Sequence, residues 1–464
     1  MTAVSRISWN HRSFRTRRRE VTTKTQTSPL GANYWRLWTA SVVSNLGDGI
    51  SGVAYPWLAS AVTRNPVQIA LVGVATRLPW LIFSLPAGVI TDRVDRRRLV
   101  VVMDVLRTVL TIAVALIVLA YQGDLASPEL IGAGRAQPPA GAGLLLAVLY
   151  VSATLFGIAE VLRDNSAQTL MPAVVAKDNL ERANGRLWGA EMLMNSFVGP
   201  PLGGFLLAVA FSLPFFVDAG TFAVAAAMAA LLTGSFRPAR SESAPARSFT
   251  ADLKEGFRWL WNHRLLRTLA IVLGLLNAAS SAAFATIVLY AQEILHLDAA
   301  GFGLMASAGA VGGVAGSFLS ARISKSLGSG PTLASTFIIG GLSSAIIGFT
   351  SSAPLVWVMF ALGSFTAVLW NVITVSLRQA IIPDRLLGRV NSVYRFFGWG
   401  MMPIGIFLGG LLVEVVEGLS NREMGLRAPF LAAAALQLLL LIYAMSRLTT
   451  AKIEAARSAA DAGD

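Results

Sequence analysis

Residues 170–207 read LMPAVVAKDNLERANGRLWGAEMLMNSFVGPPLGGFLL, and residues 381–412 read IIPDRLLGRVNSVYRFFGWGMMPIGIFLGGLL. The two stretches share, in the same order, a proline, an arginine two positions before an asparagine, and a glycine pair followed by apolar residues. The matching residues are Pro172 and Pro383, Arg182 with Asn184 and Arg389 with Asn391, and Gly203-Gly204 and Gly409-Gly410. The chain therefore contains an internal repeat, and its fold must hold two corresponding halves.

The composition around this repeat indicates a membrane protein. Of 464 residues, 55% are hydrophobic and 14% are charged, whereas soluble domains carry roughly 25% charged residues. An apolar helix of about 20 residues crosses the hydrocarbon core, and continuous apolar runs favour helices over a barrel. Such runs occur at 36–60, 67–90, 99–121, 142–163, 184–209, 213–234, 266–291, 302–322, 331–350, 354–377, 391–415 and 429–447. We predict an all-α membrane protein with twelve transmembrane helices in two pseudo-symmetric six-helix bundles.

The positions of the 38 Lys and Arg residues predict the orientation. Eight lie before or at the start of span 1, and twenty-one lie in or beside the connections after spans 2, 4, 6, 8 and 10. The connections on the other side hold four: Arg64, Arg135, Arg422 and Arg427. Because basic loops stay in the cytoplasm, we expect a multi-pass protein with both termini cytoplasmic.

Five segments follow from this reading. A basic tail (1–35) precedes a first bundle (36–234), and a cytoplasmic linker (235–265) joins it to a second bundle (266–447) and a cytoplasmic tail (448–464). In the linker, Phe249, Leu253, Phe257, Leu260 and Trp261 recur at helical spacing, which predicts an amphipathic helix at the membrane surface. The net charge of +13 comes largely from the basic segments, so we expect contact with membrane lipid and not with nucleic acid.

Several kinds of chemistry find no support in the sequence. Cysteine is absent, and the three histidines lie outside the apolar runs, so we expect no metal site and no cofactor. A phosphate-binding Gly-Lys-Ser/Thr loop is also lacking, which argues against direct drive by nucleotide hydrolysis. We expect a protein that is not an enzyme.

The connection between spans 2 and 3 reads GVITDRVDRRR, residues 88–98, and resembles the loop signature of the major facilitator superfamily. The family pattern has glycine where Asp95 stands. We expect Gly88 to permit close helix packing, and Asp92 to bridge a helix N-terminus or Arg107. Such a cytoplasmic gate would hold one access state. Its expected members are Gly88, Asp92, Arg93, Arg96, Arg97 and Arg107, and the alternative is that the arginines only set topology.

A second motif in span 5, Gly199-Pro200-Pro201-Leu202-Gly203-Gly204, resembles the signature of drug–proton antiporters in that superfamily. Proline kinks the helix and small residues allow close packing, so Gly199, Pro200, Gly203 and Gly204 are candidates for a pivot; a plain packing face is the alternative. Together the motifs are most similar to the branch of enterobactin exporters and macrolide efflux proteins. The resemblance implies proton-coupled export of small amphipathic compounds across the bacterial inner membrane by alternating access, and we expect a monomer.

Ionisable residues within the spans are candidates for proton coupling, because each is costly to bury in lipid. Asp48 and Arg77 lie at roughly 18 Å and 15 Å from opposite faces at 1.5 Å per residue, so we predict that they face each other. Protonation of Asp48 would open this pair; a static ion pair is the alternative. Glu191 is the second candidate proton carrier. Glu160, Asp104 and Asp218 are expected nearer the span ends, as gate or headgroup-level residues.

The second half offers polar and aromatic groups instead of acids. Its spans carry only Glu293 and Glu414, both near their outer ends. Candidates for a substrate cavity are Asn45, Asn277, Trp370 and Asn371; the alternative is that the Trp and Asn residues are packing or interfacial residues. Rival functions are an uptake or lipid-moving carrier of the same fold, or a membrane sensor that binds a ligand without transporting it.

Overall fold

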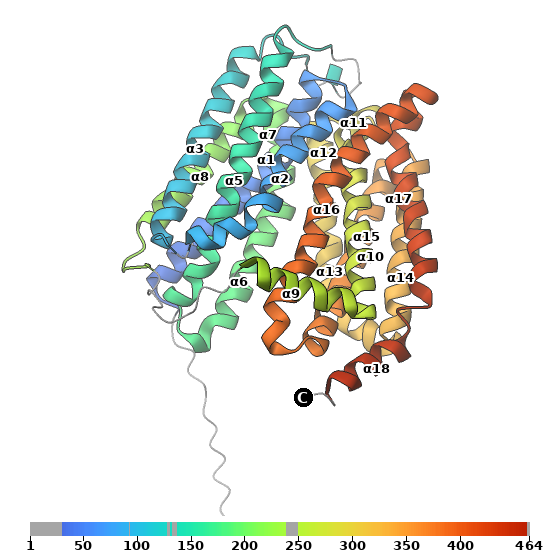
Figure 1. Cartoon of the computed structure of the whole chain (residues 1–464). Coiled ribbons are helices and arrows are strands. Elements are labelled where there is room, and N and C mark those ends of the chain that lie inside the picture. The colour runs from blue at the N-terminus through green and yellow to red at the C-terminus, as the bar shows by residue number, and fades with distance from the viewer. Residues whose placement is uncertain (1–29, 92, 128–129, 132–136, 238–248, 462–464) are drawn as a thin grey trace, which may run out of the picture.

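A computed structural model describes residues 30–91, 93–127, 130–131, 137–237 and 249–461. In this part of the chain the regular structure is helical, and the helices form two bundles side by side (Figure 1). Below, the lower side means the side on which the linker helix and the last helix lie in Figure 1, and the upper side means the opposite one.

The first bundle contains six spans. Its helices are α1 (Ala32–Val62), α2 (Pro66–Thr91), α3 (Arg96–Tyr121), α5 (Ala142–Val174), the composite α6 (Leu180–Met192), η2 (Leu193–Val198) and α7 (Gly199–Val209), and α8 (Leu213–Ala230). A single turn, η1 (Lys177–Asn179), precedes α6. The composite span contains one π-helical segment directly before the prolines. Pro200 and Pro201 lack the N–H groups that bond carbonyls one turn earlier, and the wider turn stands where those bonds are lost.

The second bundle repeats this arrangement. Its spans are α10 (Arg264–Phe284) with α11 (Ile287–Glu293), α12 (Ala299–Ala306) with α13 (Ala308–Leu327), α14 (Ser329–Phe349), α15 (Ala353–Ile381), α16 (Asp384–Leu419) and α17 (Arg422–Met445). Eleven spans of the described chain are long and apolar enough to cross a membrane. The twelfth is α1, whose 31 residues include Asn45, Asp48 and several serines. The predicted all-helical, twelve-span fold is confirmed.

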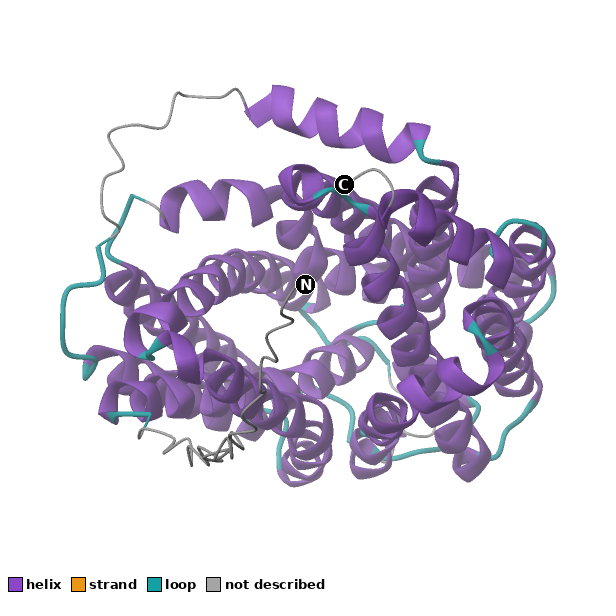
Figure 2. Cartoon of the chain, turned by 90° about the horizontal axis from the view of Figure 1, so that it is seen from below, coloured by secondary structure: helices purple, strands orange, loops and turns teal. Residues whose placement is uncertain are grey.

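Two further helices lie on the lower side, α9 (Phe249–Asn262) and α18 (Thr450–Asp461). The predicted linker helix is therefore present, and Figure 2 shows it along one edge of the molecule seen from below. It packs on α16. Glu255 forms an ion pair with Arg389, and the Phe257 and Trp261 rings each stack 6.3 Å from Phe397.

The glycine pairs of the repeat join the two bundles. A Cβ on Gly203 would collide with the backbone of α1 at Ile50, and one on Gly204 would collide with α12 of the other bundle at Ala299 and Gly303. In the second half, a Cβ on Gly409 would collide with α10 at Ala282, and one on Gly410 would collide with α2 of the first bundle at Ala70 and Pro66. Each pair therefore has one glycine against its own bundle and one against the other, so the sequence repeat is also a structural one.

Candidate functional site

The centre of the first bundle holds a cluster of buried charges. Arg107 on α3 is fully buried and forms an ion pair with Asp48 on α1. Its Nη1 donates to the Ser44 hydroxyl at 2.9 Å. The guanidinium lies between two aromatic rings, with Cζ 4.4 Å from the centroid of Phe156 and 3.9 Å from that of Phe222. Arg107 is thus fixed, whereas the Asp48 side chain is 17% exposed.

A second arginine extends the cluster toward the lower side. Asp104 Oδ1 lies 3.6 Å from Arg107 Nη1 and 3.4 Å from Arg163 Nε on α5. Arg163 also lies 3.3 Å from Asp164 Oδ1 and donates to the Ala40 carbonyl of α1 at 3.3 Å. The two buried arginines therefore connect α1, α3 and α5 through shared carboxylates.

The predicted facing pair of Asp48 and Arg77 is wrong. Asp48 pairs with Arg107, and Arg77 lies exposed on α2, within electrostatic range of Glu160. Depth along two helices does not specify the direction in which their side chains point. In this bundle α1 packs more extensively on α7 and α8 than on α2, which turns Asp48 away from Arg77.

The expected headgroup-level position of Asp104 and Asp218 is also wrong, because both side chains are fully buried inside the bundle. Asp218 accepts hydrogen bonds from the hydroxyls of Ser51 and Thr221, and Gly47 leaves room for it against α1. Glu160 is half-buried. Glu191 on α6 lies within reach of the Ser41 hydroxyl and the Arg163 charge, so the structure brings this second candidate to the edge of the same cluster.

The Gly-Pro motif of span 5 lies directly beside Asp48. Gly49 and Gly199 are in backbone contact, and Gly203 follows one turn later against Ile50. Gly199, Pro200, Gly203 and Gly204 are all buried. The motif therefore brings α1, which carries Asp48, into close contact with α7, which in turn contacts the second bundle.

The loop between α2 and α3 differs from its expectation. A Cβ at Gly88 would meet open space, so the predicted close packing at Gly88 is wrong. Asp92 lies outside the described residues. Arg107, a predicted member of the gate, lies instead in the central cluster and pairs with Asp48. Asp95, in the place of the family's glycine, caps α3 by accepting from the Arg98 N–H at 3.0 Å.

The basic residues of that loop mostly stay on the lower surface. Arg93 is exposed and Arg97 is half-buried. Arg96 Nη1 donates to the Thr169 carbonyl of α5 at 3.1 Å, within the same bundle. A gating role for Arg93, Arg96 and Arg97 stays a prediction.

Polar residues join the two bundles on the upper side. Arg64, between α1 and α2, forms an ion pair with Glu293 and donates to Gln292 Oε1 at 2.6 Å. Arg422, at the start of α17, lies 2.9 Å from Glu293 Oε2 and donates to the Arg64 carbonyl at 2.9 Å. We call Arg64, Gln292, Glu293 and Arg422 the upper cluster. The sequence did not predict this cluster, because it identified Glu293 only as an acid near the outer end of a span.

The surroundings of Glu293 favour its charged form. Burial alone would raise its pKa, but hydrogen bonds from Arg422 and the charge of Arg64 outweigh burial and hold the pKa of Glu293 below its usual value. Conversely, burial lowers the pKa of Arg64, and Glu293 offsets part of that effect. The cluster therefore links the bundles through a charged carboxylate.

A cavity of about 930 Å³ lies inside the second bundle, and Gly52 and Pro56 of α1 contribute to its wall. Of the four predicted cavity residues, Asn277, Trp370 and Asn371 line it. Asn277 donates to the Gly398 carbonyl at 2.8 Å. Asn45 instead bonds the Ser41 carbonyl within its own helix at 2.9 Å and is not among the lining residues.

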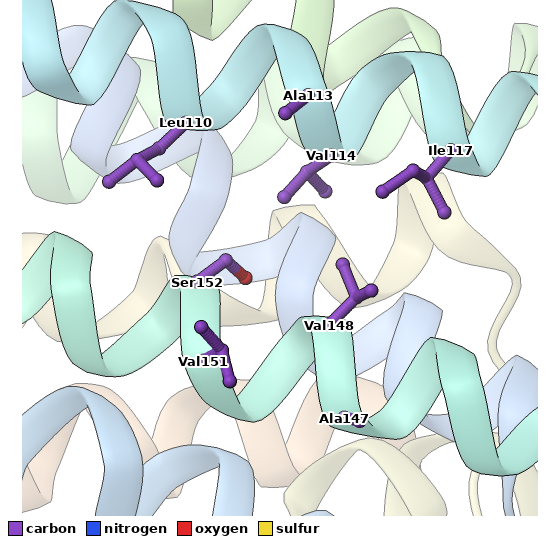
Figure 3. A pocket seen from close by; sticks show the side chains of 8 residues that line it. All are labelled: Leu110, Ala113, Val114, Ile117, Ala147, Val148, Val151 and Ser152. Carbon is purple, nitrogen blue, oxygen red and sulfur yellow. The ribbon is translucent and has the colours of Figure 1, made fainter.

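A second hollow lies between α3 and α5 and is nearly all apolar (Figure 3). Its one polar lining side chain, Ser152, donates to the Leu149 carbonyl at 3.2 Å. Several of its residues are exposed on the outside of the bundle, among them Ala113, Ala147 and Val151. Such a groove suits a lipid chain better than a polar solute.

Comparisons with known proteins agree with this architecture. Residues 24–462 match the family model described as "transmembrane secretion effector". The multidrug efflux pump Tap of Mycobacterium tuberculosis (strain ATCC 25618 / H37Rv) is 30% identical over 406 residues, which cover 85% of this chain and 88% of Tap. The chain belongs to the major facilitator superfamily of membrane transporters.

Other major facilitator proteins extend the likeness. The enterobactin exporter EntS of Citrobacter koseri (strain ATCC BAA-895 / CDC 4225-83 / SGSC4696) is 24% identical over 363 residues, covering 77% of this chain and 80% of EntS. A bacterial homologue of the iron transporter ferroportin, solved in an inward-facing state, superposes with a TM-score of 0.66 at 18% identity over 89% of this chain and 99% of that one. The chain is thus a multi-pass transporter and not an enzyme.

Proposed function

We propose that this major facilitator protein exports small amphipathic compounds from a bacterial cell in exchange for protons. It works by alternating access in the inner membrane, as a monomer with both termini in the cytoplasm. The named activities of Tap, a multidrug efflux pump, and EntS, an enterobactin exporter, support export and the substrate class. The concentration of basic residues on the lower side supports the orientation.

The observation that carries proton coupling is the Asp48–Arg107 pair. A carboxylate near the middle of a span is kept there by a fixed arginine, and such groups mark proton relays in transporters. Protonation of Asp48 removes the negative charge of the ion pair, so the pair no longer holds α1 to α3. Because α1 contacts α7, and α7 contacts α12 of the second bundle, the change reaches the surface along which the two bundles move.

The upper cluster supports the direction of access in this conformation. Its ion pairs hold the bundles together on the upper side, which the basic-loop distribution assigns to the outside. The substrate therefore enters from the cytoplasm, and the upper cluster opens when it leaves. The basic N-terminal segment, whose residues 1–29 lie outside the described part, stays a predicted lipid contact.

Vesicle transport tests this function. Inside-out vesicles with an acidic lumen should accumulate members of a panel of amphipathic compounds. Right-side-out vesicles should not accumulate them, and a protonophore should abolish the accumulation. Accumulation only in right-side-out vesicles would show an uptake carrier. Binding of compounds without movement in either orientation would show a sensor.

A further inference from the structure

The second-bundle cavity has an unbalanced charge. Its lining includes two cationic side chains, Arg378 on α15 and Arg395 on α16, and no Asp or Glu. In the first bundle the buried arginines share carboxylates. The cavity arginines have no such partner among the described residues, so their charge is available to something that enters the cavity.

Arg378 is held in place but keeps unused donors. Its side chain is 9% exposed, its Nε donates to the Thr374 carbonyl at 3.3 Å and its Nη1 to Asn391 Oδ1 at 3.3 Å. The guanidinium stacks 3.8 Å from the centroid of the Tyr394 ring. Its Nη2 makes no hydrogen bond to a described residue. A buried guanidinium with neutral partners favours an anion, and Arg is suited to carboxylates and similar planar oxyanions.

An indole donor adds a second, independent feature. Trp370 lines the cavity and is 4% exposed, yet its Nε1–H has no hydrogen-bond partner among the described residues. Buried indole N–H groups normally find an acceptor. The ring itself is fixed edge-on against Phe337, with centroids 5.5 Å apart. An oxygen acceptor on a bound molecule would satisfy this group.

The rest of the cavity wall suits an apolar or aromatic body. It includes Phe284, Phe302, Phe360 and Phe430, and Trp399, over whose ring the Arg395 guanidinium lies at 5.1 Å. Ligand sites commonly combine apolar walls with a few polar groups that fix orientation. The polar lining also includes neutral amides and hydroxyls, such as those of Asn371 and Gln437, but its charged side chains are both cationic, so a cationic amphiphile would bring its charge toward two arginines.

We propose that this cavity binds amphipathic organic anions, with the acidic group held by Arg378 and Arg395 and accepting from the Trp370 indole. The inference rests on the proposed function in one respect, namely that this cavity is the site at which the transported compound binds. It narrows the transported compounds to those with a carboxylate, sulfonate or acidic phenol on an apolar body.

Two fluorescent compounds that differ only in charge provide the test. The probe 8-anilinonaphthalene-1-sulfonate is an anion, and N-phenyl-1-naphthylamine is the same ring system without the sulfonate. Binding of each to the purified full chain in nanodiscs is measured by titration, with empty nanodiscs subtracted. Arg378→Gln should weaken binding of the anion about tenfold, the size expected for loss of a charged hydrogen bond, and leave the neutral compound unchanged. Arg378→Lys should recover part of the affinity.

A matched control is Arg447→Gln. Arg447 also stacks on a tyrosine, 4.0 Å from the Tyr443 centroid, but it is exposed and outside the cavity lining, so both affinities should stay unchanged. Equal affinity of the wild type and Arg378→Gln for the anion, or an equal loss for both compounds, would overturn the proposal. If Arg378→Gln does not fold, Arg395→Gln and Trp370→Phe decide by the same criterion. This readout is equilibrium binding and not transport. Anion binding can therefore be disproved while proton-driven export holds, and proton-driven export can be disproved while anion binding holds.

Discussion

Arg107 sets the chemistry at the residue scale. A guanidinium between two phenylalanine rings cannot leave the bundle easily, and it contacts both Asp48 and Asp104. Burying a charge costs several kcal/mol unless its partner is present. The pair is therefore costly to remove, and Asp48 is its partly exposed member.

Replacement of Arg107 by Gln should destabilise the protein strongly. It removes the counter-charge of Asp48 and leaves Asp104 paired with Arg163 alone, and loss of one partner of a buried pair costs about 3–5 kcal/mol. Thermal unfolding of the detergent-solubilised protein should show a clear fall in Tm. Arg93→Gln, at an exposed arginine on the lower side, should change stability by less than about 0.5 kcal/mol. Equal Tm values for the two variants would contradict the structural role of Arg107.

The sequence predicted which residues carry charge in the membrane but not how they pair. Asp48 and Glu191 were selected as proton-coupling candidates because an acid in an apolar run is conspicuous; the structure places both at the charge cluster, and their role stays a prediction. The partner of Asp48 was missed because two arginines, Arg77 and Arg107, lie at compatible depths. Asp218 was assigned to a span end because sequence gives the position along a helix and not its neighbours. The rotation of each helix about its own axis decides both the partner of Asp48 and the surroundings of Asp218. This rotation depends on packing across the bundle.

At the scale of elements, α7 is the helix that connects the charge cluster to the second bundle. Gly203 of α7 contacts α1 at Ile50, close to Asp48. The residue that follows it, Gly204, contacts α12. Helices in lipid associate largely by close packing of small residues. A movement of α1 can therefore reach α12 through a single rigid helix.

A single added methyl group should test this contact. In Gly204→Ala the new Cβ would overlap the Ala299 carbonyl oxygen of α12, and overpacking of this kind costs typically 1–3 kcal/mol. We expect a lower Tm and weaker association of the bundles. Gly220→Ala on α8, where a Cβ meets open space, should be neutral or slightly stabilising, since Ala favours helix. If both variants behave alike, the α7–α12 contact carries no special weight.

The sequence predicted the positions of the spans well, because a helix that crosses the membrane needs an apolar run as long as the hydrocarbon core is thick. It also predicted the paired glycines, since the repeat shows them twice. It could not predict the interruptions of spans 7 and 8, at Ala285–Thr286 and at Ser307, where neither proline nor glycine stands. It likewise gave no sign of the π-helical turn at 193–198, which depends on how the two prolines that follow are accommodated.

At the scale of the whole molecule, the upper cluster holds the two bundles together. Arg64 comes from the first bundle, and Glu293 and Arg422 come from two helices of the second. The sequence could not reveal this cluster, because Arg64 precedes Glu293 by 229 residues, Arg422 follows Glu293 by 129 residues, and such residues are ordinary in loops. Its ion pairs must break for the upper side to open.

The state of the upper cluster should depend on pH with a defined sign. The pKa of Glu293 is lowered in the joined state, so that state is favoured above the usual glutamate pKa of about 4.3 and is lost as pH falls through the lowered value. The chain has no cysteine, so spin labels can be placed at Asp124→Cys and Ser352→Cys on the upper side without background. Their distance should stay short at neutral and mildly acidic pH and lengthen only after the pH has fallen below that usual glutamate value.

Glu293→Gln should lengthen the same distance at pH 7, because it removes the charge that Arg64 and Arg422 share. A label pair on the lower side, Lys177→Cys with Ser326→Cys, should shorten at the same time if the bundles rock as rigid bodies. Glu423→Gln is the control, since that exposed acid pairs with Arg427 within α17. An unchanged upper distance in Glu293→Gln would remove the cluster from the account of access.

Proton coupling through Asp48 is tested most directly by comparing uphill transport with exchange in reconstituted vesicles. For a folded Asp48→Asn variant, we predict that labelled substrate still exchanges with unlabelled substrate across the membrane. The variant should no longer accumulate substrate against its gradient when a pH gradient is applied. Asp178→Asn, at an exposed acid on the lower side, should keep both activities. Retention of full pH-driven accumulation by Asp48→Asn would contradict the account.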